Sequence, residues 1–565
     1  MYCLIYEPEA QLTCLQIAFY FAFTQSYFTF LTVPAAIGTT TWLFGGKFSM
    51  VYAFIACLWT IVFVEYWKHQ EQDLAVRWGV HGVSKISSKR REFKHEKETT
   101  DPVTGEKIQI FPATKRLQRQ FIQVPFAIIA SIALGSLIAF AFGIEIFITE
   151  IYNGPFKSVL AFLPTGILTT LMPILTGILT NAATWLNKYE NYDTDSAYQH
   201  AMTQKIFVLN FITSYLGIFL TAFVYVPFAK SIVPYLDIFS LTVRPFAENE
   251  KQMQAPTSSG FKINPDRLRK QVIYFVVTAQ FVNFAMEVIV PYLKRQGFIK
   301  YKELQSERAA KKGGAAPDPS ENDLAEEAPF LHRVRLESEL DVYNVTDDMR
   351  EMVLQFGYLA LFSVVWPVTG LSFLINNWIE LRADAVKICV EMQRPTPSRA
   401  DTIGPWLDSL SFLSWLGSVT SAALVYMFSN DGIGPGGTPT TIKGWGLLLS
   451  ILFSEHLYLL VRWAVHIGIS KIDTPGREKE RRDRFMTRKR YFDESLNQTY
   501  ALPAMGNMGE KITRQSLEEE ARLGSLRSSR PEERFWARQR SWKDSATIGA
   551  QLIERSAPEE AKKTK

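Results

Sequence analysis

Ten long apolar stretches recur along the chain, and this pattern constrains the fold more than any other feature of the sequence. A helix of about 20 apolar residues is long enough to cross the hydrocarbon core of a bilayer. Although 47% of the residues are hydrophobic, charged segments between the runs bring the mean hydropathy to +0.00. The runs lie near residues 16–38, 46–66, 121–150, 156–187, 204–229, 267–293, 349–369, 371–391, 404–428 and 443–470. We therefore predict an all-α integral membrane protein with about ten transmembrane helices.

Basic segments between and after the runs predict the topology. The loop after the second run contains KISSKRREFKHEKE, and the tail contains REKERRDRFMTRKR. Because Lys and Arg are enriched on the cytosolic side, both segments and both termini are expected in the cytosol. The predicted divisions are a short N-terminal segment (1–15), helices one and two (16–66), a basic cytosolic loop (67–120), helices three to six (121–293), a disordered cytosolic linker (294–343), helices seven to ten (344–470) and a basic cytosolic tail (471–565).

The seventh and eighth runs carry acidic and amide side chains at helical spacing. Two acids are three residues apart, and three further polar residues follow at steps of four, so each set occupies one helical face. The sixth run adds an Asn and a Glu, and the predicted topology brings all five acids to the cytosolic half of the membrane. The candidate metal ligands are Asn283, Glu287, Asp348, Glu351, Asn376, Glu380 and Asp384.

The five carboxylates need compensation inside a bilayer. Each costs roughly 2.5–3.5 kcal/mol at the centre of a membrane helix, and a bound cation is the simplest remedy. Ca²⁺ prefers oxygen ligands from Asp, Glu and Asn, while the absence of His and Cys disfavours zinc and copper. We therefore predict a Ca²⁺ site. Two other interpretations are a proton relay or ion-coupled transporter, and internal pairing with Arg382 or Lys387.

Polar side chains also line one face of each of the fourth, fifth and sixth runs. Such faces are typical of a track for hydrophilic cargo, but threonines in membrane helices also bond their own helix or join helices together. Both interpretations stay open for each face. The predicted track residues are Thr165, Thr169, Thr176, Thr180, Asn210, Ser214, Thr221, Arg267, Gln271, Tyr274 and Thr278.

The sixth run links these polar faces to the acids. At about 100° per residue, Asn283 and Glu287 lie on the opposite side of the helix from Arg267 and its stripe. Pro291 removes the hydrogen bond that the Glu287 carbonyl would accept and so loosens the helix near the acids. We expect Pro291 to take part in gating.

Other classes of function find no support in the sequence. There is no nucleophile–base pair, phosphate loop or dinucleotide fingerprint, so we expect no enzyme, no catalytic residue and no nucleic-acid partner. In the tenth run, Glu455, Arg462 and His466 lie at helical spacing and predict a structural polar contact, with a subunit interface as one possible place for it.

Several runs of sequence resemble the anoctamin family, most strongly its fungal calcium-activated lipid scramblases. They are NFAMEVIVPYLKRQ, DDMREMVLQFGYLALF, FLINNWIELRADAVKICVEMQRP, ADTIGPWLDSLSFLSWLGS, EYWKHQEQDLAVRWG and QKIFVLNFITSYL. The similarity extends from about Phe19 to Tyr491. It implies a homodimer joined through the tenth helix, a membrane-facing hydrophilic groove lined by helices three to seven, and two Ca²⁺ ions per subunit held by the candidate ligands above.

Two departures from the family pattern are visible. The family has a cytosolic domain before the first helix, and this chain begins almost at that helix. Two explanations stay open: the N-terminal domain is absent, or the sequence comes from a truncated gene model. Channel-type members carry a glycine hinge in the sixth helix, whereas no Gly occurs from Gln271 to Arg295. The second departure favours the scramblase type.

The sequence and the resemblance together predict a Ca²⁺-activated phospholipid scramblase with an accompanying nonselective ion conduction. The alternatives are a Ca²⁺-activated chloride channel and a protein that tethers membranes through its basic tail. The expected location is the plasma membrane or the endoplasmic reticulum, with phospholipids as the transported partner.

Overall fold

The computed structural model describes most of the helical part of the chain. The described residues are 15–46, 48–86, 89–100, 107–225, 227–228, 266–290, 293, 297, 300–301, 324, 327–338, 340–393, 395, 400–428 and 443–500. At positions such as 107–109, 287–288 and 492–500 only the backbone is described.

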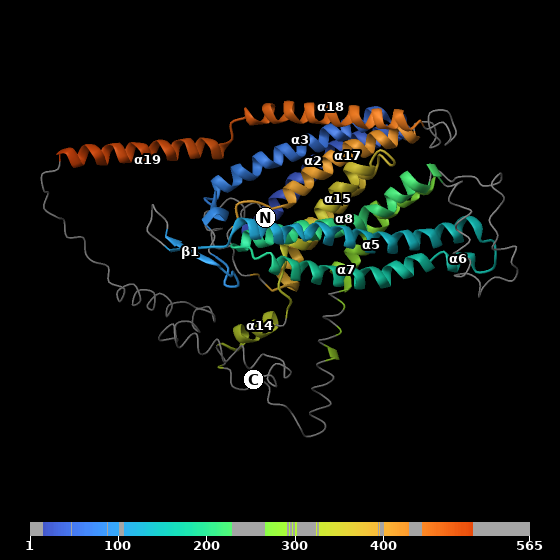
Figure 1. Ribbon diagram of the computed structural model, residues 1–565, viewed down its shortest axis with the longest axis horizontal. Helices are drawn as coiled ribbons and strands as arrows, with labels where there is room; N and C mark the ends of the chain where they lie inside the picture. The colour runs from blue at the N-terminus through green and yellow to red at the C-terminus, as the bar shows by residue number, and fades with distance from the viewer. Residues whose placement is uncertain are drawn as a thin grey trace, which may run out of the picture. The chain divides into compact units, whose positions relative to one another are not determined.

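The described elements are almost all helices (Figure 1). In chain order they are α2 (Leu15–Phe44), α3 (Met50–Arg77), η2 (Val83–Ile86), β1 (Lys97–Thr100), β2 (Lys107–Ile110), α4 (Ala113–Phe121), α5 (Gln123–Ile146), η3 (Phe147–Ile151), α6 (Lys157–Leu160), α7 (Leu163–Tyr189), α8 (Asp195–Phe219), η4 (Leu220–Tyr225), α11 (Asp266–Ile273), η8 (Tyr274–Thr278), α12 (Ala279–Phe284), η9 (Ala285–Ile289), α14 (Ala328–Ser338), α15 (Val345–Phe362), α16 (Thr369–Val386), η10 (Lys387–Glu391), α17 (Trp406–Phe428), α18 (Gly444–Ser470) and α19 (Pro475–Tyr500).

The predicted all-α membrane fold is confirmed, and each of the ten apolar runs falls on helical elements. Within the part of the chain that the structure describes, six helical segments are long and apolar enough to cross a membrane: Met50–Arg77, Ala113–Thr149, Lys157–Tyr189, Asp195–Tyr225, Trp406–Phe428 and Gly444–Ser470. α15 and α16 are 18 residues each and carry several charged side chains, which lowers their hydropathy. The count of ten transmembrane helices stays a prediction.

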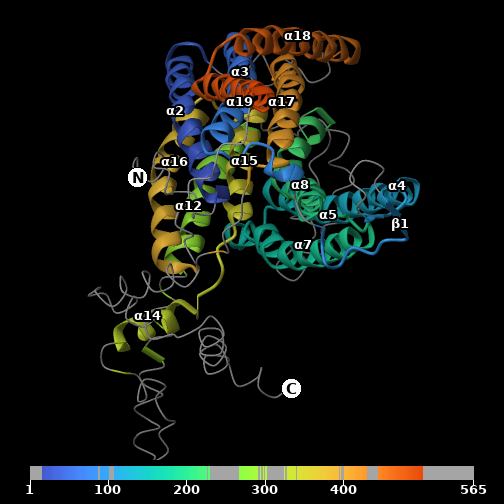
Figure 2. The ribbon, with the colours of Figure 1, turned by 90° about the vertical axis from the view of Figure 1, so that its left-hand side faces the viewer.

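The chain divides into two units, of which the first holds nearly all of these helices. It comprises Met1–Val282, Val345–Leu381 and Pro397–Arg481. Within it α17 packs between α15, α3 and α18, and α2 lies beside α3. Helices α5, α7 and α8 pack against one another, and Figure 2 shows them side by side with α4.

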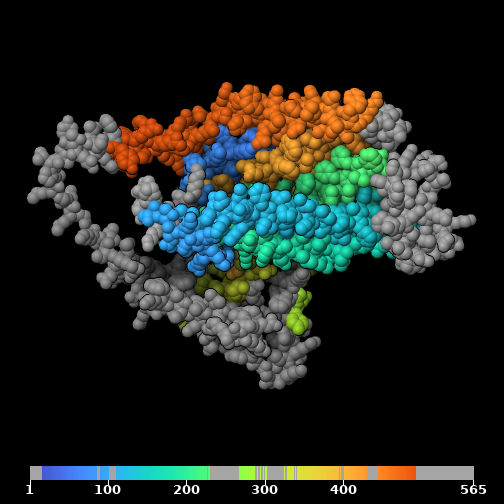
Figure 3. All heavy atoms as spheres, viewed as in Figure 1, coloured from blue at the N-terminus to red at the C-terminus, as the bar shows by residue number. Residues whose placement is uncertain are grey.

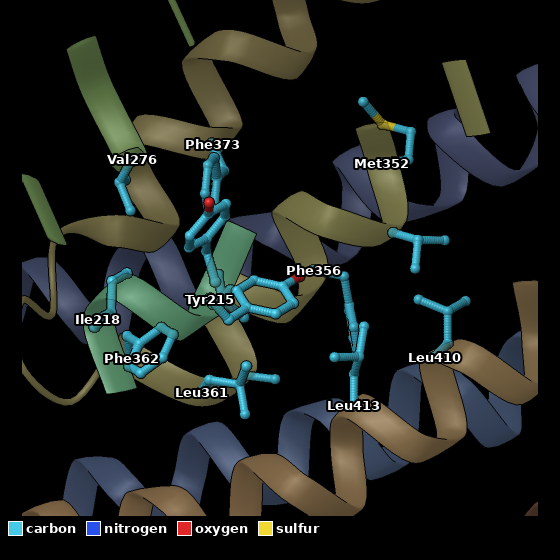
Figure 4. Close-up of a cluster of buried hydrophobic side chains, with 14 of the residues drawn as sticks. Tyr215, Ile218, Val276, Met352, Phe356, Leu361, Phe362, Phe373, Leu410 and Leu413 are labelled. Carbon is cyan, nitrogen blue, oxygen red and sulfur yellow. The ribbon is translucent and has the colours of Figure 1, made fainter. Parts of the chain in front are cut away.

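Aromatic and aliphatic side chains fill the centre of the first unit. Figure 4 shows Tyr215, Phe356, Phe362 and Leu413 converging from α8, α15 and α17. The Tyr215 hydroxyl donates to the Leu354 carbonyl at 2.9 Å, which satisfies its only polar group in an apolar setting. These contacts hold α15 in place, and α15 carries two of the candidate ligands.

α15 and α17 approach closely at a glycine. A Cβ added to Gly417 would lie 2.7 Å from the carbonyl oxygen of Ala360 on α15. Because the neighbouring atom is backbone, it cannot turn away as a flexible side chain can. Gly417 therefore sets the separation of the two helices.

Carboxylates near the end of α3 hold the starts of two other segments. Glu71 accepts a hydrogen bond from the Ile403 backbone N–H just before α17. Asp73 accepts from the Gly476 N–H at 2.6 Å, in the first turn of α19, and also pairs with Arg77. Both acids are buried, so their hydrogen bonds offset the cost of removing them from water.

A buried ion pair closes the turn between α7 and α8. The ammonium group of Lys205 lies 2.8 Å from Glu190 Oε2 and also donates to Asn187 Oδ1 at 3.0 Å. The Tyr192 hydroxyl donates to the same Glu190 oxygen at 2.7 Å, and burial raises the pKa of that hydroxyl, so it stays protonated. This network fixes α7 against α8.

The second unit comprises Asn283–Asn344, Arg382–Thr396 and Arg482–Lys565. Its described part includes a short parallel bridge between Val342 and Gln393. It also includes α14, which lies in the segment expected to be a disordered linker. Apolar residues Phe330, Leu331 and Val334 follow helical spacing there, and Leu331 is buried, which explains a helix at this point.

The segment expected to be a basic cytosolic loop contains a two-stranded antiparallel hairpin. β1 and β2 pair with Lys97 opposite Ile110, and the side chains of β1 are exposed. This hairpin is an addition to the predicted all-α architecture.

We expect Gly417→Ala to destabilise the protein by about 1–3 kcal/mol, because the added methyl group overpacks the α15–α17 contact. Thermal unfolding of the detergent-solubilised protein measures the change. Gly468→Ala on α18 is the matched control, since a Cβ there meets nothing within 4 Å. Equal unfolding temperatures for the two variants would contradict the assignment of Gly417.

Candidate functional site

α15 presents its acids in its first two turns. Asp347 and Asp348 lie in the first turn, where the positive end of the helix dipole favours carboxylates. Asp348 is buried, while Glu351 is half-buried. The exposed Asp347 pairs with Arg350 at 3.1 Å, so it differs from its neighbour in its surroundings.

α16 carries the predicted Asn376, Glu380 and Asp384 at one-turn intervals. The Asn376 amide donates to Glu380 Oε2 at 2.9 Å, and the Gln355 amide of α15 donates to the same oxygen at 3.0 Å. Glu380 is 9% exposed. A buried carboxylate on α16 is thus tied to α15 by a charge-assisted hydrogen bond.

Three buried amides beside Glu380 were missed by the sequence analysis. Gln355 Oε1 accepts from Asn377 Nδ2 at 3.0 Å, and Gln355 Nε2 also donates to Gln280 Oε1 of α12 at 3.4 Å. Asn377 donates to the Phe373 carbonyl at 2.8 Å as well. Neutral side chains give no signal of charge compensation in a sequence, although Gln355 follows Glu351 by one helical turn.

Asp384 has a basic neighbour on its own helix. Its carboxylate lies 3.7 Å from the ammonium group of Lys387, and both side chains are buried. This pair agrees with the internal pairing that the sequence left open for one of the five acids. It gives Asp384 a compensating charge from the protein itself.

The sixth run is only partly described at its acidic end. Asn283 is exposed at the end of α12. Glu287 lies in η9, and its side chain is outside the described residues. Pro291, the predicted gating residue, also lies outside the described residues.

The acidic set fits Ca²⁺ in its donor chemistry. Its members offer carboxylate and amide oxygens, and these are the donors that Ca²⁺ prefers. Among the described residues, no three Asp, Glu, His or Cys side chains lie close enough together to hold a metal. This statement does not include Glu287, whose side chain lies outside the described residues.

The polar face of α7 is exposed at one end and half-buried at the other. Thr165 and Thr169 are exposed, whereas Thr176 and Thr180 are half-buried. The Thr169 hydroxyl donates to the Thr165 carbonyl at 2.8 Å, and Thr184 donates to the Thr180 carbonyl at 2.9 Å. Bonding to the helix's own carbonyls is therefore part of what these residues do.

The faces of α8 and the sixth run meet. Thr221 is buried in η4, directly after α8. Its hydroxyl hydrogen-bonds Gln271 Oε1 of α11. Asn210 donates to the Ile206 carbonyl at 2.9 Å, and Ser214 is half-buried. Tyr274 and Thr278, at either end of η8, are exposed. Thr221 and Gln271 of the predicted track thus join two helices, whereas Tyr274 and Thr278 are exposed.

Arg267 of α11 is held by side chains from α5, η3 and η4. Its guanidinium lies 2.6 Å from Glu145 and donates to Thr149 at 3.0 Å. It also stacks over the rings of Phe142 and Tyr225, with 5.3 and 5.2 Å to the ring centres. Arg267 therefore fastens α11 to α5 and η3 and is only 10% exposed.

The sixth run is not a uniform α-helix. It contains two π-helical segments, η8 (Tyr274–Thr278) and η9 (Ala285–Ile289). The i→i+5 pattern turns the chain by fewer degrees per residue than an α-helix does. The angular separation expected between Arg267 and Glu287 was counted on a regular α-helix, and it stays a prediction.

Helix α18 makes a polar contact within the chain and leaves a broad apolar face outside. Arg462 and His466 both contact Glu65 of α3, at 3.3 and 2.9 Å, so the predicted polar contact of these two residues is intramolecular. α18 forms an outer layer of the first unit in Figure 3. Its exposed large apolar side chains include Trp445, Leu448, Leu449, Leu452, Phe453, Leu459, Leu460 and Trp463.

Six long apolar helical segments among the described residues, polar faces on α7, α8 and the sixth run, and buried acids on α15 and α16 define a multi-pass membrane protein with polar sites inside its helical bundle. The family model described as "Anoctamin: Calcium-activated chloride channel" matches residues 15–484. The chain belongs to the anoctamin family.

The chain is similar to several curated proteins. An uncharacterized protein of Schizosaccharomyces pombe is 31% identical over 79% of this chain and 64% of its own length. Increased sodium tolerance protein 2 of Saccharomyces cerevisiae is 28% identical, covering 78% and 48%, and anoctamin-10 of Homo sapiens is 27% identical, covering 73% and 56%. The chain thus spans about half to two thirds of the length of these relatives.

We predict that Arg267 and Glu145 are energetically coupled, because their contact joins two helices at a partly buried position. In a double-mutant cycle with Arg267→Gln and Glu145→Gln, the coupling should be about 1 kcal/mol. Thermal unfolding of the three variants and the parent protein measures it. Simple additivity of the two changes would show that the ion pair does not hold these helices together.

Proposed function

We propose that the protein is a Ca²⁺-activated phospholipid scramblase. Lipid headgroups would pass between leaflets along the polar faces of α7, α8 and the sixth run, with an accompanying nonselective ion conduction. The observation that carries the proposal is the exposure of Thr165, Thr169, Tyr274 and Thr278 on otherwise apolar helices. Polar groups at such positions lower the cost of a headgroup inside the membrane.

The Ca²⁺ dependence is supported by the family and by the acids. The matching family model carries the words "calcium-activated" in its description. Two ions per subunit would be held by Glu287, Asp348, Glu351, Glu380 and Asp384, with Asn283 and Asn376 as neutral ligands. The metal would supply positive charge to buried carboxylates such as those of Asp348 and Glu380.

The sixth run connects the two parts of the proposed mechanism. Its first half carries Gln271, which bonds Thr221, and its second half carries Asn283 and Glu287. A shift of this helix changes both the polar face and the position of its acid. Its π-helical segments and Pro291 are the places where we expect the backbone to adjust.

The first alternative is a Ca²⁺-activated chloride channel, which the description of the family model favours. Against it stands the lack of Gly between Gln271 and Arg295, because the resemblance places a glycine hinge there in channel-type members. Arg267, the cation of the polar face, is already paired with Glu145. We therefore place lipid transport first.

The proposed assembly is a homodimer joined through α18. The exposed apolar residues of α18 form a continuous face and are not scattered singly over the surface. Only 6% of the most apolar 18-residue stretch of α18 is buried within the chain. We also propose that both termini are cytosolic and that the protein resides in the plasma membrane or the endoplasmic reticulum.

We expect the protein in liposomes to scramble fluorescent phospholipids when Ca²⁺ is present. Dithionite added outside should then bleach nearly all the fluorescence, and bleaching that stops at about half would rule out scrambling. Asp348→Ala combined with Glu351→Ala should abolish the Ca²⁺ stimulation, because it removes both acids of α15.

The matched control for this double variant is Asp347→Ala. Asp347 precedes Asp348 on the same turn, is exposed and pairs with Arg350, and it is not part of the proposed site. Its Ca²⁺ dependence should equal that of the parent protein. Unchanged Ca²⁺ dependence in the double variant would refute the ligand assignment, whereas chloride flux without lipid movement would favour the channel.

A second candidate function is membrane tethering, which the basic helix α19 favours. Residues 481–491 of α19 are exposed and include five Arg and one Lys. Clustered basic side chains near a bilayer bind anionic lipid surfaces. Tethering and scrambling can coexist, since they use different elements.

We predict that removing the residues after Arg481 abolishes the apposition of liposomes containing anionic lipid and leaves scrambling intact. The cut retains Gly476 and Lys479, which hydrogen-bond Asp73 and the carbonyls of Val76 and Arg77 on α3. A cut after Lys471 is the contrasting variant, because it removes these contacts as well. Undiminished liposome apposition after the shorter truncation would argue against tethering by this tail.

A further inference from the structure

The Gln355 side chain occupies the centre of a buried amide network beside Glu380. Gln355 is 1% exposed, Asn377 is 0% and Gln280 is 7% exposed. Gln355 donates to Glu380 Oε2 and Gln280 Oε1 and accepts from Asn377. Both ends of its amide group are therefore used, which fixes its orientation.

Asn377 determines which way the Gln355 amide points. Its Nδ2 donates both to Gln355 Oε1 and to the Phe373 carbonyl of its own helix. Because the acceptor end of Gln355 faces Asn377, its donor end is directed at Glu380. An inverted Gln355 would set its carbonyl oxygen against the carboxylate, which is unfavourable in a low-dielectric interior.

We propose that Gln355 is a positioning residue for the cation site: it orients the Glu380 carboxylate and links it to the sixth run through Gln280. The inference rests on the proposed Ca²⁺ dependence and adds a residue to it. The proposed role of Gln355 is to act through Glu380 and not as a ligand. Partners of metal ligands commonly change metal affinity about 10- to 100-fold when they are replaced.

The link to the sixth run ends at a π-helical segment. The Gln280 amide donates to the carbonyl of Phe275, which lies in η8, at 3.4 Å. Glu380 is thereby connected through Gln355 and Gln280 to the backbone of η8. The exposed Tyr274 and Thr278 of the proposed track are the first and last residues of that segment.

The test compares Gln355→Leu with the parent protein in the full chain. Leu keeps the approximate volume but removes both hydrogen bonds to Glu380 and Gln280. Ca²⁺-dependent thermal stabilisation in detergent gives the Ca²⁺ concentration for half-maximal effect without relying on transport. We expect that concentration to rise about 10- to 100-fold. Scrambling in liposomes should shift by a similar factor.

Two further variants separate positioning from general stability. Asn377→Leu should shift the Ca²⁺ requirement in the same direction by a smaller factor, and adding it to Gln355→Leu should cause no further shift, because it acts through Gln355. Ser414→Ala is the control. It removes a comparable buried hydrogen bond, from Ser414 to Thr60 at 2.9 Å, away from the acids.

The link to the sixth run has its own variant. Gln280→Leu removes only the longer branch of the network, so the Ca²⁺ requirement for stabilisation should change less than in Gln355→Leu. The ratio of scrambling at saturating Ca²⁺ to scrambling with chelator should fall, because a ligand shifts a conformation only through interactions that differ between states.

The possible outcomes are distinct. If Ca²⁺ neither stabilises nor stimulates the parent protein, the proposed function fails. If the parent responds and Gln355→Leu has a Ca²⁺ requirement within twofold of it, the positioning role is overturned. Should Gln355→Leu not fold, Gln355→Asn, which is one methylene shorter and keeps the polarity, is expected to raise the Ca²⁺ requirement in the same way, and a normal requirement there overturns the inference.

Discussion

The cost of placing carboxylates among apolar helices shapes the centre of this protein. Each buried acid on α16 has a partner supplied by the chain: Glu380 receives hydrogen bonds from Gln355 and Asn376, and Asp384 has the ammonium group of Lys387 nearby. Neutral amide donors leave a negative charge in place, whereas a lysine cancels it. The chain therefore compensates the two acids by different chemistry, with amide donors at Glu380 and an ammonium group at Asp384.

The sequence was a good guide wherever the information was local. Apolar runs predicted helices because hydrophobic periodicity and length depend on neighbouring residues alone, and α15 begins beside its acids because carboxylates favour a helix start. The beginning of α8 at Asp195, earlier than the apolar run indicated, is also local: the Thr194 hydroxyl caps the helix by accepting from the Ala197 N–H. Polar first turns of this kind lie outside any hydropathy window.

Partners that are distant in sequence could not be predicted in the same way. Arg267 was assigned to a track because its spacing matched Gln271 and Tyr274, yet Glu145, Thr149 and two rings from other elements hold it. Gln355 is neutral, so a search for charge compensation passed over it. The π-helical segments of the sixth run depend on an i→i+5 hydrogen-bond pattern that leaves no signal in composition.

The sixth run carries both Gln280 of the amide network beside Glu380 and the polar face that includes Gln271. Gln271 bonds Thr221 on one side of η8, while Gln280 bonds Gln355 on the other, so the π-helical segment lies between a half-buried and a buried hydrogen bond to different neighbours. Moving one of these contacts relative to the other must be accommodated by the intervening turn. A π-helical turn can convert to α-helical geometry by shifting the register of a few hydrogen bonds, which rotates the residues beyond it. Tyr274 and Thr278 bound that turn, so such a conversion would re-aim the exposed polar side chains without unfolding the helix.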